Sequence, residues 1–126
     1  FKTSDLDEKI HVVLFWSTKA GPGHLLAVPV LQRLADHYEK DPSITVIGIT
    51  AQDNAPDAVN GIMKAKKATF QNVVYADNTL LRSFAIAGLP MFYVVGADGL
   101  VTHAVAGAEI GVEKELREKV EALRQP

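Results

Sequence analysis

The chain has 126 residues, of which 48% are hydrophobic and 22% charged, with 13 Lys and Arg against 15 Asp and Glu. This length and composition are typical of one ordinary globular domain, and the formal net charge of −2 argues against nucleic-acid binding as the main function. The chain has no cysteine, which excludes disulfides, thiolate metal sites and thiol-based catalysis by this chain.

No stretch of the sequence is long enough to span a bilayer. Apolar runs such as Val12–Trp16 and Met91–Val95 fall far short of the roughly 20 residues that a transmembrane helix needs. The chain begins with Phe1 rather than Met, so we interpret it as a processed product or an excised fragment. We expect residues 1–126 to form a single domain.

The first half of the chain predicts a strand, a helix and a second strand. His11–Trp16 and Ser43–Thr50 are almost continuously apolar and rich in β-branched residues, which is typical of strands buried on both faces. Pro29 should kink the helix between them. One inward stripe of that helix is predicted from residues at helical spacing, namely Leu26, Val30, Leu31, Leu34, Ala35 and Tyr38.

The second half predicts three helices and three strands. The helices are Pro56 to about Lys67, a brief helix opened by Asn78, and Gly111 to about Gln125. The strands are Val73–Tyr75, Met91–Val95 and Leu100–Val105, with a hairpin turn at Gly96–Gly99. Since a βαβ unit needs parallel strands and a hairpin needs antiparallel ones, the order predicts an α/β fold with a mixed sheet and helices on both faces.

This order of elements resembles the thioredoxin fold, and short motifs extend the resemblance. Phe15-Trp16-Ser17-Thr18 is similar to the strand end before the family's active site, and Ala20-Gly21-Pro22-Gly23 stands where the family has Cys-Gly-Pro-Cys at a helix start. Gly88-Leu89-Pro90 resembles the loop with the family's cis-proline. The helical segment after Val46–Thr50 is similar to the insertion of the ResA/TlpA-type branch, the bacterial extracytoplasmic thiol–disulfide oxidoreductases and their peroxiredoxin relatives. An extracytoplasmic location is expected from this resemblance alone.

The departures from the family pattern determine the functional expectation. Ala20 and Gly23 stand where a helix N-terminus would lower a cysteine pKa, and neither side chain can act as a nucleophile or redox centre. Leu14 and Leu26 stand where relatives carry an acid for proton transfer, and Lys19 stands where a Trp usually precedes the first cysteine. These changes favour natural loss of the redox site. The alternative is a ResA/TlpA-type thiol–disulfide oxidoreductase whose cysteines were replaced in the laboratory.

What remains of the site is a predicted binding groove. In thioredoxin-like proteins the backbone before the cis-proline pairs with an extended peptide. The resemblance therefore implies a groove at Trp16, Pro22, Leu89 and Pro90 for a peptide or protein partner. The alternative is that Pro90 only shapes its loop and Trp16 only packs. We expect a redox-inactive thioredoxin-like domain that binds a partner or serves as a scaffold; a domain of a larger enzyme is a third possibility.

No metal or cofactor is expected. His11, His37 and His103 fall on separate predicted elements and lack the spacing of metal ligands. His24, in the first turn of its helix, is most simply a solvated surface residue. Gly21-Pro22-Gly23 is not a phosphate-binding loop, because the Gly-Lys-Ser/Thr ending is missing.

Overall fold

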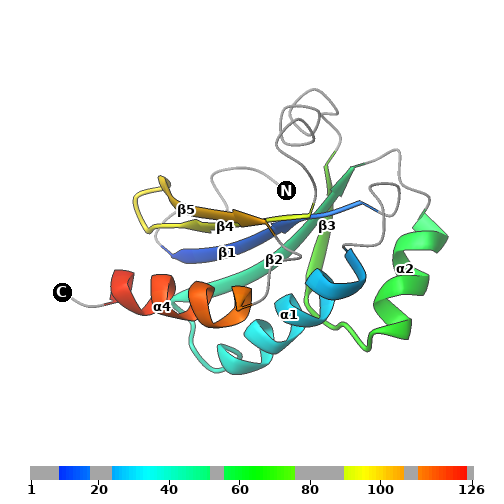
Figure 1. Cartoon of the computed structure of the whole chain (residues 1–126), viewed down its shortest axis with the longest axis horizontal. Coiled ribbons are helices and arrows are strands. Elements are labelled where there is room, and N and C mark those ends of the chain that lie inside the picture. Colours follow the sequence, from blue (N-terminus) through cyan, green and yellow to red (C-terminus); the bar gives the residue numbers. More distant parts are fainter. Residues whose placement is uncertain (1–8, 18–23, 52–55, 76–89, 107–110, 125–126) are drawn as a thin grey trace.

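The computed structural model describes residues 9–17, 24–51, 56–75, 90–106 and 111–124. Within them the chain forms one five-stranded sheet in the order β3-β2-β1-β4-β5 (Figure 1). The strands are β1 (Ile10–Phe15), β2 (Ile44–Ala51), β3 (Gln71–Tyr75), β4 (Met91–Val95) and β5 (Val101–Ala106). The helices are α1 (His24–His37), α2 (Pro56–Ala65) and α4 (Val112–Arg124). These are the predicted strands and three of the predicted helices; the brief helix expected from Asn78 lies outside the described residues.

The sheet is mixed, as predicted, and β1 lies at its centre. β1 pairs in parallel with β2 and antiparallel with β4, while β2 pairs in parallel with β3. β4 and β5 form the predicted antiparallel hairpin. At its turn the N–H of Gly96 donates to the carbonyl of Leu100 at 2.9 Å, and Gly99 has a φ of 83°, which a glycine adopts without strain.

The side chains of β1 alternate between two buried clusters. Val12 and Leu14 belong to the larger cluster, which α1, α2 and α4 cover from one side of the sheet (Figure 1). Val13 and Phe15 point to the opposite face, where they are buried with Ile47, Ile49 and Val95. Because both faces of β1 are buried, apolar residues occupy every position except that of His11, which explains the nearly continuous apolar run in the sequence.

The inward stripe of α1 differs from the predicted one at its start. Leu26 is 61% exposed, whereas Ala27, Leu31, Leu34 and Tyr38 are buried. A four-residue repeat drifts by about 40° at each step around a helix with 3.6 residues per turn, so Leu26 leaves the face on which Tyr38 lies. The observed spacing of four, three and four residues stays on one face. α1 continues through Pro29.

The ends of the two other helices depart slightly from the predictions. α2 ends at Ala65, two residues before the predicted end. Its last turn closes through Lys67, which has a φ of 55°, and the N–H of Ala68 donates to the carbonyl of Met63 at 2.7 Å. In α4, Val112, Leu116 and Val120 are buried, whereas Leu123, in the last turn, is 36% exposed.

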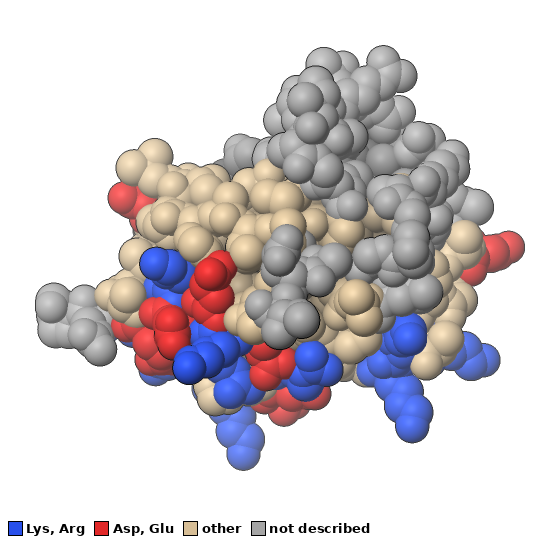
Figure 2. All heavy atoms as spheres, in the orientation of Figure 1, with Lys and Arg blue, Asp and Glu red and all other residues tan. Residues whose placement is uncertain are grey.

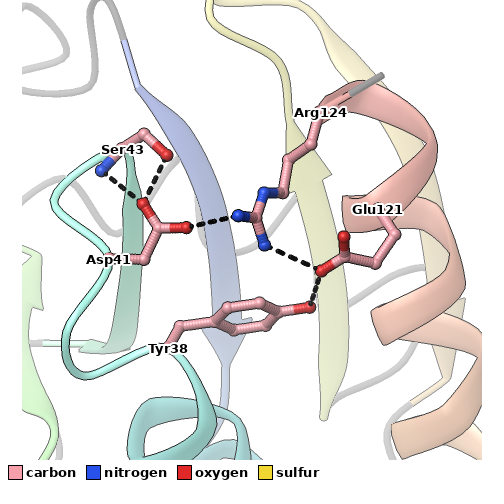
Figure 3. Close-up of polar contacts among 5 residues, drawn as sticks. All are labelled: Tyr38, Asp41, Ser43, Glu121 and Arg124. Carbon is pink, nitrogen blue, oxygen red and sulfur yellow. Dashed lines mark hydrogen bonds and ion pairs between the residues drawn. The ribbon is translucent and has the colours of Figure 1, made fainter.

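A polar seam joins α4 to the C-terminal end of α1 (Figure 3). Arg124 donates to Glu121 and to Asp41, each at 3.0 Å, and the hydroxyl of Tyr38 donates to Glu121 at 3.3 Å. Burial, followed by the charge of Glu121, raises the pKa of Tyr38 to about 12. The hydrogen bonds that Asp41 accepts from the hydroxyl and backbone N–H of Ser43 lower the pKa of this carboxyl.

A second ionic cluster lies nearer the start of α4. Glu113 accepts from Arg33 of α1, and it also pairs with Arg117, one turn along α4, at 3.2 Å. Glu115 contacts His103 of β5 at 2.8 Å. Figure 2 shows both signs of charge interspersed on the helical side of the molecule. On this face, many of the charged side chains of the described residues lie over the helices that cover the core.

Candidate functional site

The strand register places two of the predicted groove residues at the same end of the sheet. Phe15 pairs with Met91, so Trp16 and Pro90 are the next residues along two neighbouring antiparallel strands. α1 begins with His24 at this end as well (Figure 1). The other predicted residues, Pro22 and Leu89, lie outside the described residues, as does the whole Ala20–Gly23 motif.

Trp16 is held firmly inside the protein. Its side chain is 0% exposed, and its indole Nε1–H donates to Oδ1 of Asn72 at 2.9 Å. Its backbone N–H donates to the carbonyl of Ile49 at 3.1 Å. Pro90 is buried too. At this end of the sheet Trp16 and Pro90 thus belong to the interior.

Asn72, on β3, links Trp16 at the end of β1 to the strand between them, β2. Its Nδ2 donates to the hydroxyl of Thr50, a fully buried residue of β2, at 3.2 Å. The space for this arrangement comes from Gly48: a Cβ there would lie 2.5 Å from Oδ1 of Asn72 and 3.2 Å from Nε1 of Trp16. Our sequence reasoning missed Asn72. The available signal was Gly48, because a glycine inside a strand often marks a close approach by another group.

Gln32 of α1 holds the segment that leads into β3. Its Oε1 accepts from the backbone N–H groups of Thr69 at 2.7 Å and of Phe70 at 3.0 Å. Its Nε2 donates to the hydroxyl of Thr69 at 3.0 Å. One amide side chain therefore satisfies two backbone donors just before the strand begins, and it ties that strand to α1.

The two positions where relatives carry an acid have opposite environments. Leu14 is fully buried in the larger core cluster, whereas Leu26 lies exposed near the start of α1. A carboxylate at position 14 would be desolvated, which disfavours its charged form, whereas one at position 26 would stay in water. Only position 26 could carry a charged acid at little cost in the packing seen here.

The histidines of the described residues do not come together. His103 contacts Glu115, His37 packs edge-on against Tyr38 with ring centroids 4.7 Å apart, and His11 is buried in β1. Nowhere in the described ranges do three side chains of His, Cys, Asp or Glu gather as metal ligands would. Among the described helices, none has both the length and the apolar character needed to cross a membrane.

Comparison with solved structures identifies the fold. A Chlorobium tepidum protein provisionally named thiol:disulfide interchange protein DsbE has a TM-score of 0.81 at 18% identity, over 99% of this chain and 86% of that one. A secreted Mycobacterium tuberculosis disulfide oxidoreductase homologous to E. coli DsbE has a TM-score of 0.74 at 25% identity, over 98% and 88% of the two chains. StoA from Bacillus subtilis has a TM-score of 0.68 at 20% identity, over 89% and 82%.

No protein-family model and no curated protein sequence matches the chain. The structural neighbours nevertheless confirm the predicted α/β thioredoxin fold. They also agree with the predicted resemblance to the ResA/TlpA-type branch, since one neighbour is named as a thiol:disulfide interchange protein and another as a disulfide oxidoreductase.

Proposed function

We propose that this thioredoxin-fold chain is a redox-inactive binding domain, which holds an extended peptide or protein segment at the end of the sheet marked by Trp16 and Pro90. The proposal rests on one observation: residues that frame the family's active site are present in this chain, but cysteines are not. The register sets Trp16 beside Pro90, and Asn72 holds the indole in place, yet the chain has no cysteine. Dithiol exchange needs two thiols, so binding is the part of the family's activity that this framework can retain.

An extended partner would bind through its backbone first. A segment that pairs with the chain just before β4 would gain main-chain hydrogen bonds in the manner of an added strand, and pockets along it would select side chains. Trp16 and Pro90 would then support the groove from beneath, since both are buried. Leu26, exposed near the start of α1, offers an apolar contact at this end of the sheet.

We place this activity outside the cytoplasm. The support is that one structural neighbour is a secreted disulfide oxidoreductase and that the sequence resembles an extracytoplasmic branch. Expression of the full gene with a reporter that is active only in one compartment tests the location.

Titration with an unfolded chain tests the binding site. We would add reduced, carboxymethylated α-lactalbumin, which has no free thiol, to the ¹⁵N-labelled protein and follow the amide shifts. The proposal expects shifts at Trp16, Ser17 and Met91. Shifts confined to the polar seam around Arg124, or no shifts at all, would refute the assignment.

A pair of matched variants sharpens the same test. Leu26 and Leu123 are both exposed leucines on helices, but only Leu26 lies at the end of the sheet near Trp16. We expect Leu26→Ser to weaken binding of the unfolded chain by about fivefold, which is the effect of removing one modest apolar contact of about 1 kcal/mol. Leu123→Ser should leave the affinity unchanged. Equal effects of the two substitutions would contradict the proposed location.

The second candidate is an enzyme whose cysteines were replaced. The names of two structural neighbours favour it, because one is named as a thiol:disulfide interchange protein and the other as a disulfide oxidoreductase. Cysteine codons at positions 20 and 23 of the source gene would establish it. With the natural codons as in this sequence, the full-length protein should not reduce insulin disulfides.

A further inference from the structure

We infer that Asn72 is a positioning residue for the candidate binding site. Together with Gln32, it makes residues Thr69–Asn72 a brace that sets the distance between Trp16 and α1. This inference rests on the proposed function for its consequence in binding. It deepens that function by naming what holds the site in shape.

The first contact of the brace fixes the end of β1. Trp16 is buried directly after β1, and the next residue, Ser17, is only half-buried. Oδ1 of Asn72 accepts from the indole N–H of Trp16 at 2.9 Å. Asn72 is itself oriented, because its Nδ2 donates to buried Thr50 and its Oδ1 lies over Gly48. An amide held at both ends has little freedom to turn, so the indole is restrained as well.

The second contact of the brace fixes α1. Gln32 accepts from the backbone N–H groups of Thr69 and Phe70, only two residues before Asn72. The ring of Phe70 is buried in the same cluster as Leu31 and Leu34 of α1, so this attachment combines hydrogen bonds with apolar packing. The brace thus contacts α1 and Trp16 within four successive residues.

The sequence between these two anchors carries the Ala20–Gly23 motif. Trp16 stands on its N-terminal side and α1 follows on its C-terminal side, beginning with His24. Since both anchors are attached to one short segment, a change in the brace alters the separation of Trp16 and α1. Asn72 therefore acts on the binding site through Trp16, without contact to a partner.

The test compares three substitutions on β3. Asn72→Ala removes the acceptor for the indole, Asn72→Asp keeps an acceptor that the Thr50 hydroxyl can also approach as a donor, and Gln71→Ala changes a neighbouring exposed residue. Each protein is titrated with reduced, carboxymethylated α-lactalbumin. We expect Asn72→Ala to weaken binding roughly 2- to 30-fold, the range for residues that act through a packed network. Asn72→Asp should restore most of the affinity, and Gln71→Ala should match the wild type.

Fluorescence of the free proteins provides a readout that does not depend on binding. Trp16 is the only tryptophan of the chain, so emission reports its surroundings alone. We expect the emission maximum to shift in Asn72→Ala, because the buried indole loses its hydrogen-bond acceptor, to stay in place in Gln71→Ala, and to return toward the wild-type value in Asn72→Asp. The amide signals of Ser17 and His24 should shift in Asn72→Ala only. If Asn72→Ala does not fold, Asn72→Ser, which retains a smaller acceptor, takes its place.

The outcomes separate this inference from the proposed function. If the wild type does not bind the unfolded chain, the proposed function fails, and the brace is judged from the emission and amide shifts of the free proteins. Unchanged Trp16 emission and Ser17 amide in Asn72→Ala would overturn the brace. The brace would also be overturned if Asn72→Ala and Asn72→Asp lost the same amount of stability and both bound the unfolded chain as tightly as the wild type.

Discussion

Replacing Gly48 by alanine tests whether the close packing around Trp16 stabilises the protein. The added Cβ would lie 2.5 Å from Oδ1 of Asn72 and 2.7 Å from Cε1 of Phe70, both shorter than real Cβ contacts allow. Neither neighbour can move freely. Phe70 is buried and its backbone N–H donates to Gln32, while Asn72 bonds both Trp16 and Thr50.

The expected loss of stability follows from these contacts. Overpacking of a filled interior costs about 1–3 kcal/mol, and loss of the Trp16–Asn72 hydrogen bond adds about 0.5–1.5 kcal/mol. Together they lower the free energy of unfolding by about 2–4 kcal/mol. With an unfolding entropy of about 2.1 cal/mol/K per residue for 126 residues, 1 kcal/mol corresponds to about 4 °C, so Tm should fall by about 8–15 °C.

Urea and thermal unfolding followed by the fluorescence of Trp16 measure this change, and Gly61→Ala is the matched control. Gly61 lies exposed in α2, where an added Cβ meets nothing within 4 Å. Alanine there should raise stability by about 0.5–1 kcal/mol, because glycine is a poor helix former. The same substitution is thus expected to have opposite signs at the two sites. A Gly48→Ala protein as stable as the wild type would refute the reasoning.

Three further predictions concern the helices and the core. Leu26→Glu should change the free energy of unfolding by no more than about 0.5 kcal/mol, whereas Leu14→Glu should lower it by about 4 kcal/mol or more, because only the second substitution buries a carboxyl group. Urea unfolding of the two variants measures the difference, and similar losses of stability would contradict the burial seen here. Lys67→Gly should raise Tm with a gain of about 0.5–1 kcal/mol, since Lys67 has a φ of 55°; a neutral or lower Tm would count against strain at this position. Tyr38 should make the protein less stable as the pH rises from about 10 toward 12, because the folded state keeps a phenol proton that the unfolded state releases. The stability of the wild type relative to Tyr38→Phe should therefore decline over that pH range in urea titrations, and a constant difference would show that the hydroxyl has the same pKa in both states.

The strands were predictable because their patterns are local. β1 reads as a continuous apolar run in the sequence, and the hairpin turn is marked by Gly96 and Gly99. The structure confirms both features. They were predictable because each depends on residues that are close together in the chain. The mixed character of the sheet also followed, because a βαβ unit needs parallel strands and a hairpin needs antiparallel ones.

The packing that depends on distant residues was less predictable. Leu26 was assigned to the inward stripe because apolar residues recur every four positions from Leu26 to Tyr38. Side chains stay on one face of a helix only when steps of three and four residues alternate, and Leu26 is exposed. The Trp16–Asn72 bond joins residues 56 positions apart, and no local pattern announces it. The groove itself stays a prediction, because Pro22 and Leu89 lie outside the described residues.

The central place of β1 has a consequence for biosynthesis. Among the described strands, β1 leaves the ribosome before the others, and β2, its parallel neighbour, follows soon after. The strand that covers its other edge is β4, and Phe15 must wait for Met91 to be synthesised before the two can pair. At 5–20 residues per second this delay lasts on the order of several seconds. During that time the nascent chain carries a strand that is apolar except at His11 and has one open edge, so chaperones that bind extended apolar segments would find their target in residues 10–15.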